Sequence, residues 1–492
     1  MSAFSRENPP LNGRYGPTLA LVLLALCPDI VITTAYHFLA PSMALDLHTT
    51  AATLRTANGL SNAGYAFGAI FAGFLVQRFR QRRLFLVAEG LFVVAAGLAA
   101  VAPGVAAFAV GRILQGAATG LLLVIAIPPL TTRFPATRLP LTAAAIDIAF
   151  FGAVTVGPLI GGVLATEGWR WFFGGLAALG AVGWLLGMSS LPLQPAKDPQ
   201  HRPDVMAFVF AALGTALPFY AVSQLGEHVS FGAPVFWGPM IIGLACLVAL
   251  IATQYGRDDG LIPMTKLWHS VPLAGTLCAM IAGAAYVTLL LLDELFLQQG
   301  VGLSAQATGL AQWPGVTGLI VAALIFWRLF VTRFLPHFVL AGMILLLAAG
   351  LAVALLQIGS PLALSLGISA ALGLGAGATV SPGLWLAGLS VKTQFLGRAF
   401  ALVELVRSVA DFLIAPTLQH VAMQHGQSGA ALVSGVREAA WIMFGLTILG
   451  TLAMAALYLG CGARPQAPNI ELWLSDGEPA LHSPAVRLRC RR

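Results

Sequence analysis

The stretch DIAFFGAVTVGPLIGG, residues 147–162, combines features that are unusual within one long apolar segment. Pro158 has no backbone N–H to donate, so it weakens a helix locally. Gly157, Gly161 and Gly162 have no side chains, which allows a second helix to approach closely. The stretch therefore predicts a membrane-length helix that is pliable and has a closely packed glycine seam.

The composition extends this prediction to the whole chain. The sequence of 492 residues is 58% hydrophobic and 9% charged, and its mean hydropathy is +0.86. A soluble domain carries about 25% charged residues. These values are typical of a polytopic membrane protein with little mass outside the bilayer, and they exclude a large soluble enzyme.

Fourteen apolar segments are long enough to cross a bilayer, which takes about 20 residues of helix. They lie near residues 18–39, 57–77, 83–103, 106–130, 140–165, 171–192, 205–223, 236–255, 271–296, 306–327, 334–357, 362–388, 399–421 and 439–461. The seventh is the weakest, because Pro218 and Ser223 interrupt it. The predicted fold class is an all-α polytopic membrane protein with 14 transmembrane helices.

Two long polar breaks, at residues 193–204 and 254–270, divide these segments into groups of six, two and six. Two six-helix halves are one arrangement that secondary transporters use. We therefore expect five regions: a cytoplasmic N-terminus at 1–17, a six-helix bundle at 18–192, an inserted helix pair at 205–255, a second six-helix bundle at 271–461 and a cytoplasmic tail at 462–492.

The basic residues predict the orientation of the chain. With the N-terminus inside, 21 of the 26 Lys and Arg residues fall on the cytoplasmic side. Three fall outside, at Arg55, Arg170 and Arg437, and two lie within spans, at Arg112 and Arg407. Because an excess of Lys and Arg marks cytoplasmic loops, both termini are predicted to be cytoplasmic, in the inner (cytoplasmic) membrane. The net charge of +7 is thereby explained without a nucleic-acid partner.

The loop between the second and third spans reads GFLVQRFRQRR, residues 73–83. Its arginines are sufficient to hold it in the cytoplasm. It also resembles the loop signature of the major facilitator superfamily, roughly G-x-L-x-D-R-x-G-R-R, at Gly73, Leu75, Arg78 and its basic end. In the family, an acidic residue at the position of Gln77 helps to hold this loop against a neighbouring helix. A neutral Gln77 can only form hydrogen bonds, so the resemblance does not imply this contact here.

The stretch GRILQGAATG, residues 111–120, places an arginine inside the fourth span. A buried arginine costs about 2.5–3.5 kcal/mol on insertion scales. Arg112 should therefore face a cavity or a carboxylate, or else extend its side chain to the interface. The stretch resembles the superfamily motif R-x-x-Q-G, and the resemblance implies a role for Arg112 in proton coupling.

The glycine seam itself resembles a family motif. VGPLIGGVL is similar to the fifth-helix motif of superfamily antiporters, G-x-x-x-G-P-x-x-G-G, with Ala153 in place of the first glycine. The following WRWFF, residues 169–173, resembles the same position in the fourteen-helix drug:proton antiporters. The resemblance implies the superfamily fold and transport by exchange, and it favours export over import.

Exchange that is driven by protons requires a carboxylate that can bind and release one. Asp29, near the middle of the first span, is the leading candidate, and Arg112 is its expected partner. The fourteen-helix family usually carries an acid at this position. Asn58, Asn62 and His37 are further candidates to line the cavity or, for the histidine, to carry a proton. Asp147 either lines the inner vestibule or extends to the interface.

The thirteenth span carries the sequence VELVRSVAD, residues 403–411. Glu404, Arg407 and Asp411 share one helical face, because they are three and four residues apart. Either the arginine neutralises both acids and holds the helices together, or Asp411 and Glu404 take part in proton coupling. Acidic residues in this helix are also a feature of the drug-exporting family.

Two adjacent acids, Asp293 and Glu294, lie near the outer end of the ninth span. Adjacent helical residues point about 100° apart, so at most one should face a cavity. We expect them to mark an interfacial helix end. We expect Glu89, in the third span, to be a packing residue or to extend to the interface.

Three functions are compatible with these patterns. The first is proton-driven export of lipophilic drugs or toxic small molecules, cationic ones among them, with small molecules, protons and the lipid bilayer as partners, no cofactor beyond a proton gradient, and no metal site. The second is a superfamily importer or metabolite symporter. The third is a membrane sensor or enzyme, although the sequence contains no HExxH, GxSxG or GxxxxGK[ST] motif. The sequence does not predict the substrate, the stoichiometry or any protein partner.

Overall fold

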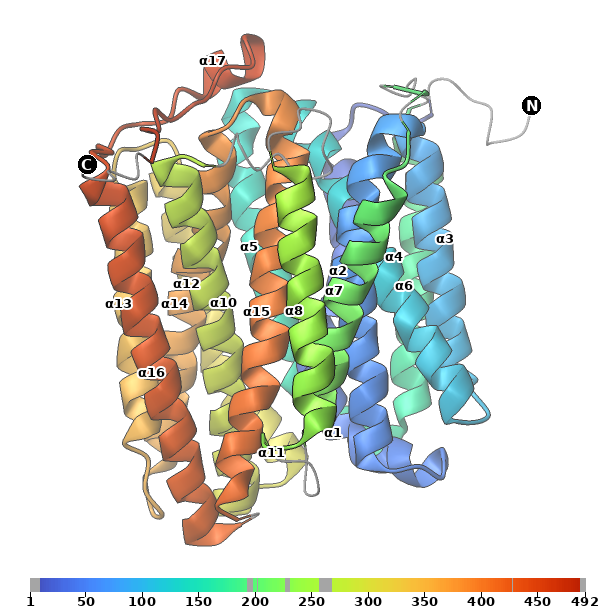
Figure 1. Ribbon diagram of the computed structural model, residues 1–492, viewed down its shortest axis with the longest axis vertical. Coiled ribbons are helices and arrows are strands. Elements are labelled where there is room, and N and C mark those ends of the chain that lie inside the picture. The colour runs from blue at the N-terminus through green and yellow to red at the C-terminus, as the bar shows by residue number, and fades with distance from the viewer. Residues whose placement is uncertain are drawn as a thin grey trace. The chain divides into compact units, whose positions relative to one another are not determined.

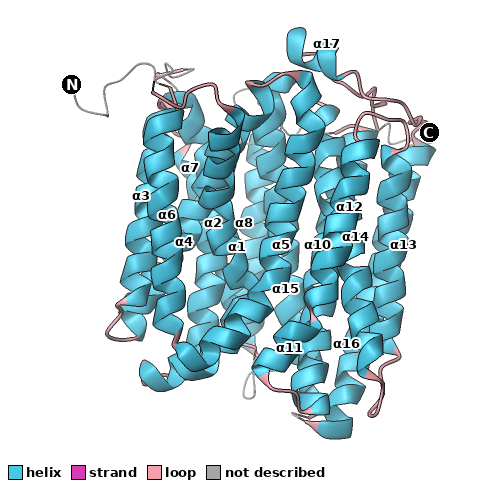
Figure 2. Ribbon diagram, turned by 180° about the vertical axis from the view of Figure 1, so that it is seen from behind, coloured by secondary structure: helices cyan, strands magenta, loops and turns pink. Residues whose placement is uncertain are grey.

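The computed structural model describes residues 9–192, 198–200, 202–225, 231–255, 268–426 and 428–486. Its regular structure is helical (Figures 1 and 2), and the β pairing within these ranges is one isolated bridge between His269 and Ala485. The basic tail at 487–492 and the greater part of the loop at 254–270 lie outside the described residues.

The long helices follow the predicted spans closely. They are α1 (Tyr15–Asp46), α2 (Ala51–Arg78), α3 (Gln81–Ala100), α4 (Val105–Thr132), α5 (Leu139–Glu167), α6 (Trp169–Ser190), α7 (Val205–Ser223), α8 (Pro234–Gln254), α10 (Ser270–Leu295), α11 (Ala305–Ala311), α12 (Trp313–Leu329), α13 (Leu335–Ala354), α14 (Leu362–Leu389), α15 (Leu396–Gln424) and α16 (Gly429–Gly460). A one-turn π-helix, Phe296–Val301, continues α10. The short elements α17 (Ile470–Ser475), η2 (Ala136–Arg138) and η4 (Thr393–Phe395) lie between or after them.

Thirteen helical segments within the described ranges are long and apolar enough to cross a membrane. One of them, Ala305–Leu329, joins α11 and α12. The predicted span that is missing from these thirteen is the thirteenth, at 399–421, which corresponds to α15; this helix has 29 residues and carries Glu404, Arg407 and Asp411. Those charges explain its lower hydropathy, and its length still exceeds the 20 or so residues that a bilayer requires.

The helices form two compact units. Unit 1 comprises Met1–Phe134, Ala153–Gln254 and Leu303–Leu310, and unit 2 comprises Pro135–Gly152, Tyr255–Gly302 and Ala311–Arg492. The chain passes from one unit to the other five times: before α5 at 134/135, within α5 at 152/153, after α8 at 254/255, after the π-helix at 302/303 and at the end of α11 at 310/311.

Unit 1 is built around the packing of α2 on α4. Glycines on both helices permit this contact: a Cβ atom on Gly64 would lie 2.7 Å from the carbonyl oxygen of Ile113, and one on Gly116 would collide with the backbone of Ser61. Gly68 and Gly120 repeat the pattern one turn further along each helix. Helix α7 packs on α2, and α8 packs on α7. We refer to Gly64, Gly68, Gly116 and Gly120 as the α2–α4 seam.

Unit 2 is built around α10, which packs against α13, α14, α15 and α16, while α12 packs against α14. Small residues again set the spacing. A Cβ atom on Gly275 of α10 would lie 3.0 Å from the backbone nitrogen of Ala387 on α14, and one on Gly383 of α14 would lie 2.9 Å from the carbonyl oxygen of Gly275.

The C-terminal tail folds back onto unit 2. Trp473 of α17 is fully buried, and its indole Nε1 donates a hydrogen bond to the carbonyl oxygen of Val391 at 3.0 Å. The backbone nitrogen of Ala480 donates to Leu389 at 2.8 Å. Lys392 and Glu478 form an exposed ion pair at 2.7 Å. The tail therefore packs on the end of α14 and on the connection between α14 and α15.

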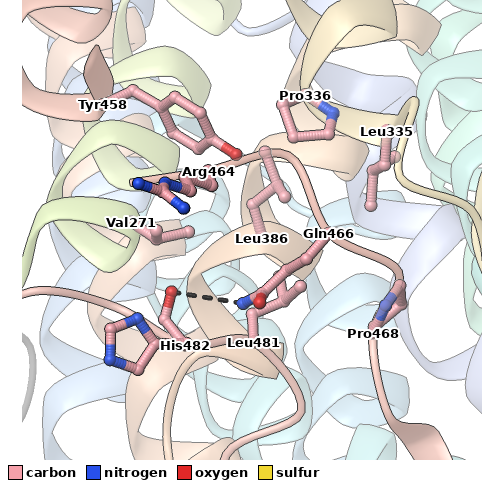
Figure 3. Close-up of a pocket in the computed structure, with 10 residues that line it drawn as sticks. All are labelled: Val271, Leu335, Pro336, Leu386, Tyr458, Arg464, Gln466, Pro468, Leu481 and His482. Atoms are coloured by element: carbon pink, nitrogen blue, oxygen red, sulfur yellow. Dashed lines mark hydrogen bonds between the residues drawn. The ribbon is translucent and has the colours of Figure 1, made fainter. Parts of the chain in front are cut away.

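A small pocket lies beneath this tail (Figure 3). The Gln466 amide spans part of it and donates a hydrogen bond to the carbonyl oxygen of His482 at 3.4 Å. It is lined by Val271, Leu335, Pro336, Leu386, Tyr458, Arg464, Gln466, Pro468, Leu481 and His482. Its wall is thus shared between helix ends and the tail, so the pocket depends on the tail being docked.

We predict that Trp473→Ala will release the tail. Removing a buried tryptophan side chain costs about 3–5 kcal/mol, and the hydrogen bond to Val391 is lost with it. Limited proteolysis with trypsin should therefore cleave after Arg464 much faster than in the unmodified protein. Leu472→Ala is the matched control, because Leu472 lies on the same short helix and is 38% exposed. Equal cleavage rates in both variants would contradict this account.

Candidate functional site

The first site joins three helices of unit 1 through Arg112. Its Nη1 atom lies 3.3 Å from Oδ1 of Asp29 on α1, and its Nη2 atom donates to Oδ1 of Asn58 on α2 at 3.1 Å. On α4 itself, Nη1 also donates to Oε1 of Gln115 at 2.7 Å. The exposed fractions of the Arg112 and Asp29 side chains are 3% and 13%. The predicted partnership of Asp29 and Arg112 is thus present in the structure.

The surroundings of this ion pair are aromatic and closely packed. The Arg112 guanidinium carbon lies 5.9 Å from the ring centroids of both Tyr36 and Phe173. Ser61 donates a hydrogen bond to the Arg112 carbonyl oxygen at 2.7 Å. A charge pair with little water around it interacts more strongly than one at a surface. A change in the charge of Asp29 therefore acts directly on Arg112 and on the helices that Arg112 joins.

Two other candidates in unit 1 are placed apart from this network. Asn62 is half-buried and takes no part in the hydrogen bonds of Arg112, whereas Asn58, one turn earlier, does. His37 is half-buried on α1, and its ring packs on Phe38 at a centroid distance of 4.1 Å. The roles predicted for Asn62 and His37 remain predictions.

The glycine seam of α5 packs against α1 and α11. A Cβ atom on Gly161 would lie 2.8 Å from the carbonyl oxygen of Ala35, and one on Gly162 would lie 2.7 Å from that of Ala305. Gly157 meets α1 at Thr34 in the same way. The close helix approach predicted from these glycines is confirmed.

Pro158 leaves a backbone acceptor in α5 that another helix satisfies. In an unbroken helix the carbonyl oxygen of Val154 would accept from the N–H at position 158, which proline lacks. The hydroxyl of Thr34 on α1 donates to this oxygen instead, at 2.5 Å. The weak point of α5 is therefore held by α1, the helix that also carries Asp29.

The loop after α2 makes its contacts through residues other than the one expected. Gln77, which replaces the acid of the family motif, donates to the carbonyl oxygen of Gly73 within its own helix at 3.2 Å. Gln81 instead donates to the carbonyl oxygen of Ile125 on α4 at 2.9 Å and accepts from Arg133 at 3.0 Å. The guanidinium of Arg78 lies over the Phe74 ring at 5.9 Å.

The second site lies on α15 in unit 2. Arg407 donates from Nε to Oε2 of Glu404 at 2.9 Å, and its two terminal nitrogens pair with Oε1 of Glu404 and Oδ2 of Asp411. Asp411 is buried, and its Oδ1 atom has no hydrogen-bond partner among the described residues. The one-face arrangement predicted from the spacing is confirmed. Arg407 therefore bonds both carboxylate oxygens of Glu404 but only one of Asp411. If all three groups are ionised, the trio carries one net negative charge.

Sequence reasoning did not identify Gly283 of α10, which makes room for this trio. A Cβ atom there would lie 2.8 Å from both Cγ of Arg407 and Oδ1 of Asp411. A glycine within an apolar span carries no information about the partner helix, so the pattern could not have shown this contact. Gln115 was likewise missed as a partner, although its position three residues after Arg112 was a usable indication.

Asp147 is fully buried in unit 2, eight residues after the start of α5. Its Oδ2 atom lies beside Gly377 of α14, next to Leu319 and Ala322 of α12. Neither carboxylate oxygen has a hydrogen-bond partner among the described residues. An extension to the interface, one of the two alternatives for Asp147, does not occur in this structure.

The expectation of an interfacial helix end at Asp293 and Glu294 was wrong. Both side chains are buried, with exposed fractions of 0% and 1%. The helix continues beyond them through the π-turn Phe296–Val301, which no pattern in the sequence indicated. Glu89 is also fully buried, packed beside Gly183 of α6, so its carboxyl group does not reach the interface.

Comparison with known proteins places the chain in a family. The sequence profile of the Major Facilitator Superfamily matches residues 21–415. The tetracenomycin C resistance and export protein of Streptomyces glaucescens is 29% identical over 436 residues, which cover 87% of this chain and 76% of the relative. The multidrug export protein EmrB of Haemophilus influenzae is 26% identical over 320 residues, covering 64% and 62% of the two chains.

Two further comparisons agree with this placement. The lincomycin resistance protein LmrB of Bacillus subtilis is 24% identical over 206 residues, covering 42% of this chain and 43% of the relative. The crystal structure of the human organic anion transporter MFSD10 superimposes with a TM-score of 0.62 at 16% identity, covering 90% of this chain and all of the other, which shows a shared fold.

The match to individual relatives is incomplete. The chain spans about half (47%) of the MFS-type transporter YhcA of Bacillus subtilis and 62% of EmrB. The family profile, in contrast, covers most of the chain and includes both ionic clusters. The fold and the helical, multi-pass character agree with it. The chain belongs to the Major Facilitator Superfamily.

Proposed function

We propose that this protein is a secondary active transporter that exports lipophilic, cationic small molecules in exchange for protons, by alternating access. The observation that carries the proposal is the buried pair of Asp29 and Arg112. Removing charged groups from water is costly, and intramembrane ionisable residues mark transport pathways and proton relays. The export proteins among the relatives support the direction of transport.

In this proposal Asp29 is the first proton-coupling residue. When Asp29 is ionised it pairs with Arg112; when it takes up a proton, Arg112 keeps its bonds to Asn58 and Gln115. The pairing of α1 with α4 thereby changes with the proton, while α2 and α4 stay joined. Asp411 and Glu404, with Arg407 between them, are the second coupling group. Asp147 supplies a further carboxyl group to the interior of unit 2.

We also propose the arrangement of the chain in the membrane. The helices at 18–192 and 271–461 act as the two six-helix bundles, and those at 205–255 form an inserted pair. Both termini face the cytoplasm, since 21 of 26 basic residues fall on that side in the fourteen-span assignment. In a bacterial cell this is the cytoplasmic membrane, and the proton gradient across it is the energy source.

Transport by everted membrane vesicles tests this proposal. A panel of fluorescent lipophilic cations is added while the internal pH is followed with an indicator dye. We expect each transported compound to be accumulated and to release protons from the vesicle lumen, in a saturable manner. Vesicles without the protein are the control. Accumulation of a metabolite in right-side-out vesicles, with no proton-linked export of any cation, would show an importer instead.

A further inference from the structure

A further carboxyl group in unit 2, that of Asp293, lies in a polar cluster that the proposed function does not use. Its Oδ2 atom accepts a hydrogen bond from Nε2 of Gln312 at 3.0 Å. Ser365 of α14 lies beside the same carboxylate. Asp293, Gln312 and Ser365 are 0%, 0% and 1% exposed. Helices α10 and α14 and the junction between α11 and α12 thus contribute polar groups to one enclosed point.

The cluster contains polar atoms that the described residues do not satisfy. Oδ1 of Asp293 and Oε1 of Gln312 have no hydrogen-bond partner among them. An ionised carboxylate in an apolar interior is strongly unfavourable unless it is paired, and such a group normally neutralises instead. A proton on Oδ2 would face the Nε2 donor of Gln312, so Oδ2 can carry it only when the amide turns its acceptor oxygen Oε1 toward the carboxyl group.

The charged groups around Asp293 do not supply a cation in place of a proton. The charged neighbour that acts on it is Glu294, which has the same sign. Helix α14 contains no charged residue. The charged or titratable residues on the other helices that pack against α10 or α14 are Asp147 in the unit 2 part of α5, Arg328 of α12, His337 of α13, Arg398, Glu404, Arg407, Asp411 and His420 of α15, and Arg437, Glu438 and Tyr458 of α16. Among these, Arg407 is engaged by Glu404 and Asp411.

Gln312 connects this carboxyl group to a break in the tenth span. It lies between α11 and α12, where Pro314 and Gly315 follow. Its carbonyl oxygen accepts from the Ser369 hydroxyl at 3.0 Å, and the Gly315 backbone nitrogen donates to that same hydroxyl oxygen at 3.0 Å. The break between α11 and α12 is therefore hydrogen-bonded to α14 through Ser369 and to α10 through Asp293.

We propose that Asp293 is a proton-binding site and that its proton sets the orientation of Gln312 at the break between α11 and α12. An amide can serve both states of a carboxyl group, because it has a donor nitrogen and an acceptor oxygen. Ionised Asp293 accepts from Nε2, whereas protonated Asp293 donates to Oε1 once the amide has turned. The proposal rests on the proposed function in that it adds a further proton site, separate from Asp29 and from the Glu404–Asp411 pair, to the exchange.

Difference infrared spectroscopy of the purified protein in detergent tests this directly. Protonated carboxyl groups absorb in a region that is separate from ionised ones. A band that Asp293→Asn removes, and that disappears reversibly as the pH of the unmodified protein is raised, is the expected result. Glu438→Gln is the control, since Glu438 is exposed and its removal should leave this band unchanged. A band unaffected by Asp293→Asn, or one that persists at every pH at which the protein stays folded, overturns the proposal.

A second variant covers the case in which Asp293→Asn fails to fold. Gln312→Leu removes the hydrogen-bond partner but keeps the acid, so the band should move to higher frequency as the carboxyl group loses its hydrogen bond. No displacement of the band would contradict the assigned contact. These spectra need no substrate. A failed vesicle assay with a normal titration would therefore refute the proposed exchange alone, and normal exchange without the titration would refute this inference alone.

Discussion

Asp29→Asn is expected to reduce proton-coupled efflux to the background of vesicles without the protein. Asparagine is nearly the same size, and its carbonyl oxygen can still accept from Arg112 at the 3.3 Å separation observed for the acid. It cannot bind or release a proton within the working pH range. The fold should therefore survive while the exchange is lost. The measurement is the initial rate of cation accumulation and proton release in everted vesicles.

The matched control for this prediction is Asp46→Asn. Asp46 lies on the same helix and also pairs with an arginine, Arg170, at 2.9 Å, but its side chain is 49% exposed. Exposed ion pairs contribute about 0–1 kcal/mol, so this variant should transport normally. Proton-coupled efflux that survives Asp29→Asn would move the coupling role to Asp411. Equal losses in both variants would indicate a general effect on α1.

Arg407→Gln is expected to have the largest effect on stability. It leaves Glu404 and Asp411 buried near one another without their shared cation. Removing one partner of a buried charged group costs about 3–5 kcal/mol. The variant should unfold at a much lower temperature in detergent, as followed by size-exclusion chromatography after heating. The control is Lys392→Gln, which breaks the exposed pair with Glu478 and should leave the unfolding temperature nearly unchanged.

A combined variant separates charge from packing at the same place. Arg407→Gln with Glu404→Gln and Asp411→Asn replaces the trio by neutral amides, so it no longer leaves the uncompensated buried charges that make the single variant costly. We expect it to recover most of the lost unfolding temperature without recovering proton exchange. If it stays as unstable as Arg407→Gln alone, the stabilisation comes from the packing of the arginine stem against Gly283.

Local patterns were sufficient to predict the helices and two of their ionic groups. Apolar runs of about 20 residues located the spans, because a helix must satisfy its own backbone within a bilayer. The cost of burying an arginine pointed from Arg112 to a carboxylate, and spacing alone put Glu404, Arg407 and Asp411 on one face. In each case the physical rule acts along a single helix or on a single charge.

The contacts that could not be predicted from the sequence are those between helices. Gln81 and Gln77 are equally plausible partners for a neighbouring helix, and only the turn of the chain after α2 decides between them. The position of Asp293 looked interfacial because the π-turn that extends α10 has no distinctive composition. Gly283 and Thr34 act on residues more than a hundred positions away, where periodicity carries no information.

The α2–α4 seam has a consequence for experiments that substitute every position of the chain. A methyl group on Gly64 would press on the Ile113 backbone, and one on Gly116 on that of Ser61, so neither helix can yield by turning a side chain. In a saturation screen for drug tolerance, these glycines should score as intolerant as Asp29. They contact no charge and bind no proton. A map of mutational sensitivity would therefore mark the glycines that set the helix spacing of unit 1 as strongly as the residues that bind protons. Measuring protein abundance together with growth would separate variants that fail to fold from variants that fold but do not transport.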